Sequence, residues 1–164
     1  MQRIGIIGAM AQEVNILAGQ LDNAERYEHA GFVFHTGTRH GLEVIILQSG
    51  IGKVNAAVGT AILLERHQPD AIINTGSAGG FATDLAIGDV IISDEVRHHD
   101  VDAVVFGYEL GQVPGMPAAY HADSRLRDIA RGAIAALGEV NVREGMIATG
   151  DAFMADPEQV ATTR

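Results

Sequence analysis

The sequence has 164 residues, no cysteine and a formal net charge of −10 at neutral pH, and 47% of its residues are hydrophobic. This apolar fraction suffices for one globular core, so we expect a single domain over residues 1–164. The acidic balance disfavours nucleic acids and membrane surfaces as partners, because both carry negative charge. The absence of cysteine excludes disulfides and thiol chemistry. Since no secretory signal or membrane-spanning run is evident either, we expect a cytoplasmic protein.

Short β-branched runs bounded by glycine predict buried strands at residues 3–7, 44–47, 71–74, 90–93 and 146–148. A more exposed strand is expected over residues 31–38. Apolar residues at spacings of three and four predict helices over residues 12–21, 53–67 and 123–137. The last helix has Asp123 as its N-cap and Gly138 as its stop. Strands that alternate with helices predict an α/β fold, with a mixed, mostly parallel central sheet flanked by helices.

Residues 98–120 lack the periodicity of a helix or a strand. The segment carries bulky groups such as Phe106 and Tyr108 together with several glycines and prolines. Ordered loops of this length in compact domains are usually functional. We therefore expect a long ordered loop that acts as a lid or as a subunit contact.

Three glycine-containing turns follow predicted strands, at residues 8–10, 49–53 and 75–80. In open parallel sheets, ligands bind beyond the carboxyl ends of the strands, where such turns expose backbone N–H groups. One turn alone is better explained as a tight connection, but three at one sheet edge indicate a small-molecule crevice. None of them matches the P-loop or the dinucleotide-binding pattern.

Glu13 is the most informative carboxylate, because it lies in the first turn of a predicted helix beside this crevice. Partial burial there would raise its pKa toward the working range of a general base. The alternative is a structural glutamate that complements the helix dipole. Asp94 and Glu95 are equally consistent with catalysis and with a solvated strand end, and Asp151 with a turn cap.

A cluster of potential metal ligands occurs near the middle of the chain, at His98, His99, Asp100 and Asp102. Adjacent residues of a strand point to opposite faces, and no second histidine follows at helical spacing. We therefore predict no metal site and no cofactor.

Six motifs together strongly resemble the 5′-methylthioadenosine/S-adenosylhomocysteine nucleosidases. They are IGIIGAM at residues 4–10 with Glu13, SGIGKVNAA at 49–57, INTGSAGG at 73–80, GDV at 88–90, FGY at 106–108 and TGDAF at 149–153. The resemblance implies the purine nucleoside phosphorylase fold, a homodimer, and hydrolysis of an N-glycosidic bond that releases adenine from small adenine thionucleosides.

The resemblance also implies a role for individual residues. Glu13 corresponds to the glutamate that activates water, and Ser77 to a residue near that water and the ribose. Phe153 would stack on adenine, and the Met154 backbone would hydrogen-bond the base. The other substrate-binding positions implied are Ala9, Met10, Ile51, Ala78 and Gly79, with Phe106 and Pro114 contributed by the neighbouring subunit.

In the family, an aspartate of a Ser-Asp pair protonates adenine and a Met-Glu pair holds the ribose. Neither pair is found where the family has it, so the resemblance implies a fold that is incomplete at its C-terminus. Proteolysis at Arg164, a truncated gene product and a separate second chain are the alternatives for this end.

The superfamily also contains phosphorylases, which carry an arginine three residues before the serine that Ser77 matches, whereas this chain has Asn74. Hydrolysis is therefore expected, and the resemblance implies 5′-methylthioadenosine, S-adenosylhomocysteine and 5′-deoxyadenosine as substrates, in a step of methionine salvage. An aminodeoxyfutalosine nucleosidase and an inactive ligand-binding fragment are the alternatives.

Overall fold

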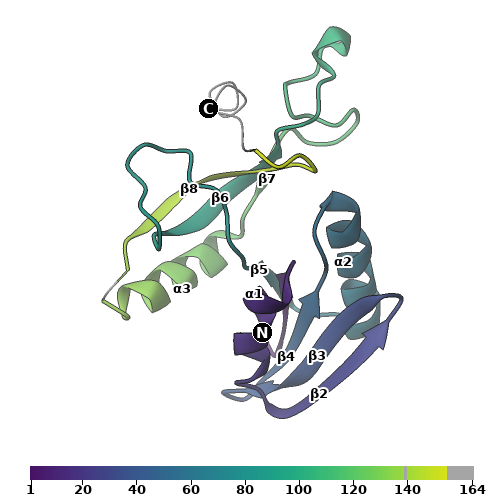
Figure 1. Ribbon diagram of the computed structural model, residues 1–164, viewed down its shortest axis with the longest axis vertical. Helices are drawn as coiled ribbons and strands as arrows, with labels where there is room; N and C mark the ends of the chain where they lie inside the picture. The colour runs from purple at the N-terminus through teal and green to yellow at the C-terminus, as the bar shows by residue number, and fades with distance from the viewer. Residues whose placement is uncertain (139, 155–164) are drawn as a thin grey trace. The chain divides into compact units, whose positions relative to one another are not determined.

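The structure is a computed structural model that describes residues 1–138 and 140–154, and the chain divides into two compact units, Met1–Ala78 and Gly79–Arg164 (Figure 1). The first unit contains β1 (Arg3–Gly8), α1 (Ala11–Ala18), β2 (Asp22–His29), β3 (Phe32–Arg39), β4 (Leu42–Gln48), α2 (Lys53–His67) and β5 (Ala71–Asn74). The second unit contains β6 (Val90–His98), the 3₁₀ helix η1 (Val104–Phe106), β7 (Tyr120–His121), α3 (Ser124–Ala135) and β8 (Val142–Thr149).

The sheet of the first unit has the strand order β2-β3-β4-β1-β5. Strand β1 pairs in parallel with both β4 and β5, whereas β2, β3 and β4 form antiparallel hairpins. The two hairpin turns are Ala30-Gly31 and His40-Gly41, and all four of these residues have positive φ. Two successive residues with positive φ are typical of the type I′ turn, whose twist suits a two-residue hairpin.

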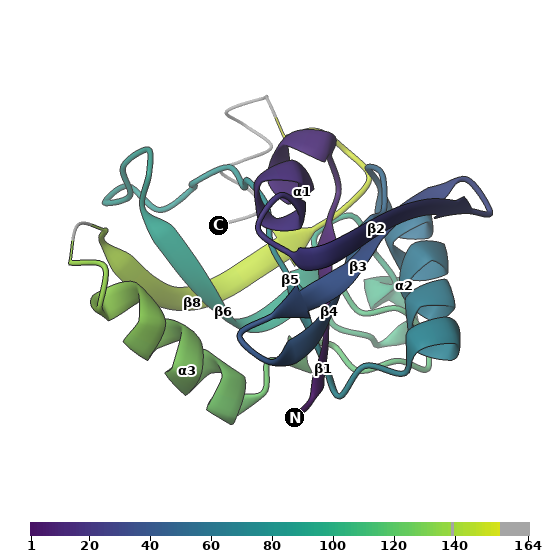
Figure 2. The same ribbon diagram turned by 90° about the horizontal axis from the view of Figure 1, so that it is seen from below.

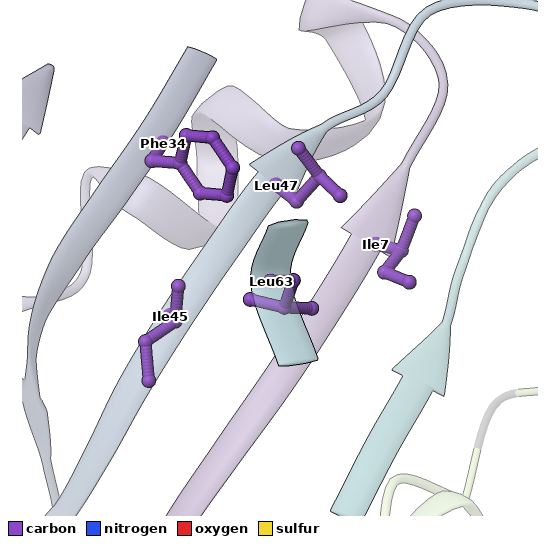
Figure 3. Packing of buried hydrophobic residues seen from close by; sticks show 5 residues of the cluster. All are labelled: Ile7, Phe34, Ile45, Leu47 and Leu63. Carbon is purple, nitrogen blue, oxygen red and sulfur yellow. The ribbon is translucent and has the colours of Figure 1, made fainter. Parts of the chain in front are cut away.

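The core of the first unit lies on both faces of β4, because successive side chains of a strand point to opposite faces. Ile45 and Leu47 pack against Leu63 of α2 in one cluster (Figure 3). Val44 and Ile46 pack against α1 in the other cluster. Figure 2 shows the two helices on either side of this sheet. The continuous apolar run of β4 is therefore explained by burial on both faces.

In the second unit, β6 pairs in parallel with β8 and antiparallel with β7. Helix α3 packs along β6 and β8. Asp123 is its N-cap, since the carboxylate accepts a hydrogen bond from Leu126 N at 2.9 Å. Arg127 and Arg131 of α3 both form ion pairs with Glu144 of β8. These ion pairs thus join α3 to β8.

The structure confirms the α/β class, with mixed sheets flanked by helices, and helix α2 has the predicted bounds. The predicted bounds are wrong for the first helix, which ends at Ala18, and for β6 and β8, which are longer than expected. The strand expected over residues 31–38 is β3, which is more exposed than β4 although its Phe34 is fully buried. Residues 99–119 form the expected long loop and contain η1, while the role of this loop stays a prediction. Within the described residues, no helix has the length and apolar character to cross a membrane.

Substitutions of Leu63 and of its neighbour Leu64 test the packing of the core in the first unit. Leu63 is fully buried against β4, whereas Leu64 is 47% exposed on the same helix. We expect Leu63→Ala to lower the free energy of unfolding by about 2–5 kcal/mol, because it removes buried methyl groups and leaves a cavity. Leu64→Ala is the control and should change it by less than about 0.5 kcal/mol in urea denaturation. Equal effects of the two substitutions would contradict this packing.

Candidate active site at the carboxyl ends of three parallel strands

Three turns meet at one edge of the first sheet, as the sequence predicted. They follow β4, β1 and β5, which are neighbouring parallel strands, so their carboxyl ends lie together. Backbone hydrogen bonds continue beyond the strands, from Gly50 N to Ala9 O at 3.0 Å and from Thr75 N to Ile7 O at 2.9 Å. Ser49 is buried at this edge, and its Oγ donates to Gly50 O at 2.9 Å. The turns therefore form one hydrogen-bonded surface.

Glu13 is the third residue of α1, and its carboxylate lies at the junction of two of these turns. Oε2 accepts hydrogen bonds from Ala9 N at 2.8 Å and Met10 N at 2.9 Å. Oε1 accepts from Ser77 N at 3.1 Å and from Ser77 Oγ at 3.3 Å. These four donors match the roughly four lone-pair sites of an ionised carboxylate. The structural interpretation is confirmed, since Glu13 caps α1. The carboxylate also reaches across to the turn after β5, and its role in catalysis stays a prediction.

Two glycines allow this approach. A Cβ on Gly76 would lie 2.8 Å from Glu13 Oε1, and a Cβ on Gly8 would lie 2.7 Å from Val14 Cγ1. Both distances are too short for real Cβ contacts. Gly8 therefore lets the first turn of α1 fold against β1, and Gly76 lets the carboxylate reach Ser77. The role of Gly76 was not predicted, and the available signal was its place directly before Ser77 in the turn.

The expected rise in the pKa of Glu13 is wrong, because the pKa is lowered. Desolvation by partial burial raises it, but the hydrogen bonds from Ser77, Met10 and Ala9 stabilise the charged form and together outweigh burial. Glu13 is therefore ionised at neutral pH and able to accept a proton.

The same hydrogen bonds make folding depend on pH. Because the pKa of Glu13 is lower in the folded than in the unfolded chain, they favour folding fully above the unfolded-state pKa. This contribution is lost as the pH falls through the folded-state pKa. Acid should therefore loosen the junction between α1 and the turn after β5.

The remaining predicted site residues divide between the two units. Within the first unit, Ile51 lies in the turn after β4 with 72% of its surface exposed, and Ala78 follows Ser77 and is exposed. The second unit contains the other five, which are Gly79, Phe106 in η1, Pro114, Phe153 and Met154. Phe153 is 92% exposed. Of the predicted site residues, four are in direct contact in the structure, because Glu13 accepts hydrogen bonds from Ala9, Met10 and Ser77.

The other polar candidates have structural partners. Asp94 and Glu95 do not lie at a strand end, because β6 continues to His98. Glu95 pairs with Arg97 at 2.8 Å, and Asp94 accepts from the backbone N–H of Glu95 at 2.8 Å. Among the residues that the structure describes, no group of three or more histidines and carboxylates is placed to hold a metal ion.

The chain is similar to known proteins over nearly its whole length. The sequence model of the phosphorylase superfamily matches residues 3–162, so the chain belongs to that superfamily. A 5′-methylthioadenosine/S-adenosylhomocysteine nucleosidase from Chromohalobacter salexigens is 65% identical over 164 residues, which cover 100% of this chain and 70% of the relative. Within the superfamily, the chain belongs to the 5′-methylthioadenosine/S-adenosylhomocysteine nucleosidase family.

Solved structures of the same family superimpose closely. The nucleosidase from Colwellia psychrerythraea, in complex with adenine, is 50% identical with a TM-score of 0.96, and the match covers 99% of this chain and 68% of that one. The nucleosidase from Neisseria meningitidis, in complex with methylthio-immucillin-A, is 40% identical with a TM-score of 0.97, covering 100% and 71%. These similarities extend over both units of the chain.

The hydrogen bonds at Glu13 predict its titration. We expect the NMR shift of its carboxyl carbon to titrate with a midpoint below the ordinary value for glutamate. Gly76→Ala should raise this midpoint, because the added methyl group displaces Oε1 from Ser77. Gly145→Ala is the control, since nothing lies within 4 Å of that Cβ position. A wild-type midpoint at or above the ordinary value would refute the hydrogen-bond arrangement.

Proposed function

We propose that the protein is a nucleosidase that hydrolyses the N-glycosidic bond of 5′-methylthioadenosine and S-adenosylhomocysteine and releases adenine. The observation that carries this proposal is the ionised Glu13 at the edge where three turns meet, held by Ala9, Met10 and Ser77. Membership of the nucleosidase family, with 65% identity to one relative over the whole chain, supports the same substrates.

The reaction needs a group that takes a proton from water. As the bond between ribose C1′ and adenine N9 breaks, positive charge builds on the sugar and water attacks C1′. Glu13 accepts the proton of this water. The Ser77 hydroxyl makes the longest of the four contacts to Glu13, at 3.3 Å, and it can rotate away to let the water approach Oε1. The bonding electron pair leaves with adenine, which takes a proton from a second acid that the resemblance places outside residues 1–164.

Phe153 and Met154 are proposed to bind the base. An aromatic side chain that is 92% exposed offers its face for stacking, and adenine presents a flat aromatic surface. The backbone of Met154 would supply the hydrogen bond that distinguishes adenine from other bases. The complex of the Colwellia psychrerythraea nucleosidase with adenine supports a base site in this fold.

Charge favours water over phosphate as the nucleophile. Glu13 is negative at neutral pH and would repel a phosphate anion. The turn after β5 begins with Asn74, where phosphorylases of the superfamily are expected to carry an arginine. Phosphorolysis would need such a cation to hold the anion.

Glu13→Gln tests the proposal in the full-length protein. Glutamine keeps the shape but cannot take a proton, so adenine release from 5′-methylthioadenosine in phosphate-free buffer should fall by about 10²–10⁴-fold. Binding of the nucleoside, measured by calorimetry, should persist. Glu28→Gln on β2, which removes one exposed charge, is the control and should keep wild-type turnover. Near-normal turnover in Glu13→Gln, or a wild-type reaction that requires phosphate, would overturn the proposal.

We further propose a homodimer in which Phe106 and Pro114 reach the neighbouring subunit's site. Helix α2 supports a second copy as the partner. Ile51, Val54 and Val58 are exposed apolar residues along one side of α2 and the turn before it, and Leu63 packs on the other side. Exposed apolar stripes of this kind usually mark a protein interface.

Val54→Asp tests this interface. An aspartate in the first turn of α2 is favourable for the helix itself, so the substitution should not unfold the monomer. It would bury a charge in the dimer, and we expect light scattering to show a dimer for the wild type and a monomer for the variant. Asn23→Asp adds the same charge at an exposed position of β2 and should remain dimeric. A monomeric wild type or a dimeric Val54→Asp would refute this interface.

A further inference from the structure

The ends of β6 and β8 are joined by hydrogen bonds that continue past the strands. The parallel ladder pairs His98 with Thr149 as its last register position. Beyond it, His99 N donates to Thr149 O at 2.9 Å. Asp100 follows His99 and Asp151 lies two residues after Thr149, and Asp151 N donates to Asp100 Oδ2, also at 2.9 Å. Beyond the last backbone hydrogen bond between the two segments, the acceptor is therefore the Asp100 carboxylate.

Gly150 lets the two segments approach. A Cβ on Gly150 would lie 2.4 Å from His99 Nε2 and 3.0 Å from Asp100 Cγ. Both side chains therefore lie directly against the backbone at Gly150. His99 and Asp100, two of the four residues considered as metal ligands, thus lie against the turn after β8.

We infer that Asp100 is a positioning residue for the base-binding segment 152–154, an inference that rests on the proposed function. Phe153 is 92% exposed, so packing of its own side chain contributes little to holding the segment. An ionised carboxylate that accepts from a backbone N–H makes a stronger hydrogen bond than a neutral acceptor does. The anchor at Asp151 N lies two residues before Phe153, and it sets the position from which the ring meets adenine.

Asp100 and Glu13 have separate roles, one in substrate binding and the other in the chemical step. Asp100 acts on the segment that holds the base, whereas Glu13 acts on the water. Loss of the anchor should therefore raise KM for the nucleoside and the inhibition constant of adenine more than it lowers kcat. A general loss of fold would instead lower the amount of active enzyme and leave KM unchanged.

Asp100→Ala, Asp100→Asn and Asp128→Ala, made in the full-length protein, test this role. We expect Asp100→Ala to raise KM for 5′-methylthioadenosine and the inhibition constant of adenine by about tenfold each, the size of one lost charge-assisted hydrogen bond. Asp100→Asn should stay within about threefold, because its amide oxygen still accepts from Asp151 N. Asp128→Ala on α3, which loses an exposed ion pair with Arg131, should match the wild type. Asp100→Ser, too short to reach Asp151 N, replaces the alanine variant if that variant does not fold.

A double-mutant cycle with Phe153→Ala decides whether Asp100 acts through the ring. If it does, Asp100→Ala should have little further effect on adenine inhibition in the Phe153→Ala background. An undiminished effect there, or an unchanged KM in Asp100→Ala alone, would overturn the inference. The wild type is assayed in parallel. A wild type that releases no adenine would refute the proposed function itself, whereas an active wild type with an unaffected Asp100→Ala refutes only the positioning role.

Discussion

The parallel pairing of β1 with β4 on one side and β5 on the other is the constraint on which the site depends. Parallel strands bring their carboxyl ends to one edge, and the turns that follow are then forced into contact. Glu13 and Ser77 are 64 residues apart in the sequence. They meet because one follows β1 and the other follows β5. The antiparallel hairpins of β2 and β3 widen the sheet and bury Phe34, but they contribute no residue to this edge.

The parts of the fold that were predictable from sequence are those with a strong local pattern. Helix α2 was predicted with its observed bounds because its apolar spacing ends at Pro69. Strand β2 was missed because, apart from Tyr27, its residues are small or polar and show no alternation. Its pairing comes from the hairpin instead. The turns Ala30-Gly31 and His40-Gly41 were the available signal, since glycine favours the positive φ that such turns require.

The error over Glu13 has a physical cause that local sequence does not reveal. Burial and hydrogen bonding shift the pKa of a carboxyl in opposite directions, and only burial could be guessed from the apolar neighbours in α1. Two of the four donors belong to Ser77, and the sheet alone brings them close. The same four contacts hold the carboxylate in one orientation. For the proposed role of Glu13, such order lowers the cost of reorganisation during the reaction.

In the structure, the glycines of these turns have a different role from the one that the sequence suggested. From the sequence, they suggested a backbone that closely approaches a ligand. At Gly8 and Gly76 the group that comes close belongs to the protein itself, Val14 in one case and the Glu13 carboxylate in the other. The same holds for Gly150, which admits His99 and Asp100. In all three turns, then, the missing side chain makes room for other residues of the protein. A methyl group at any of these positions would displace the residues packed against it.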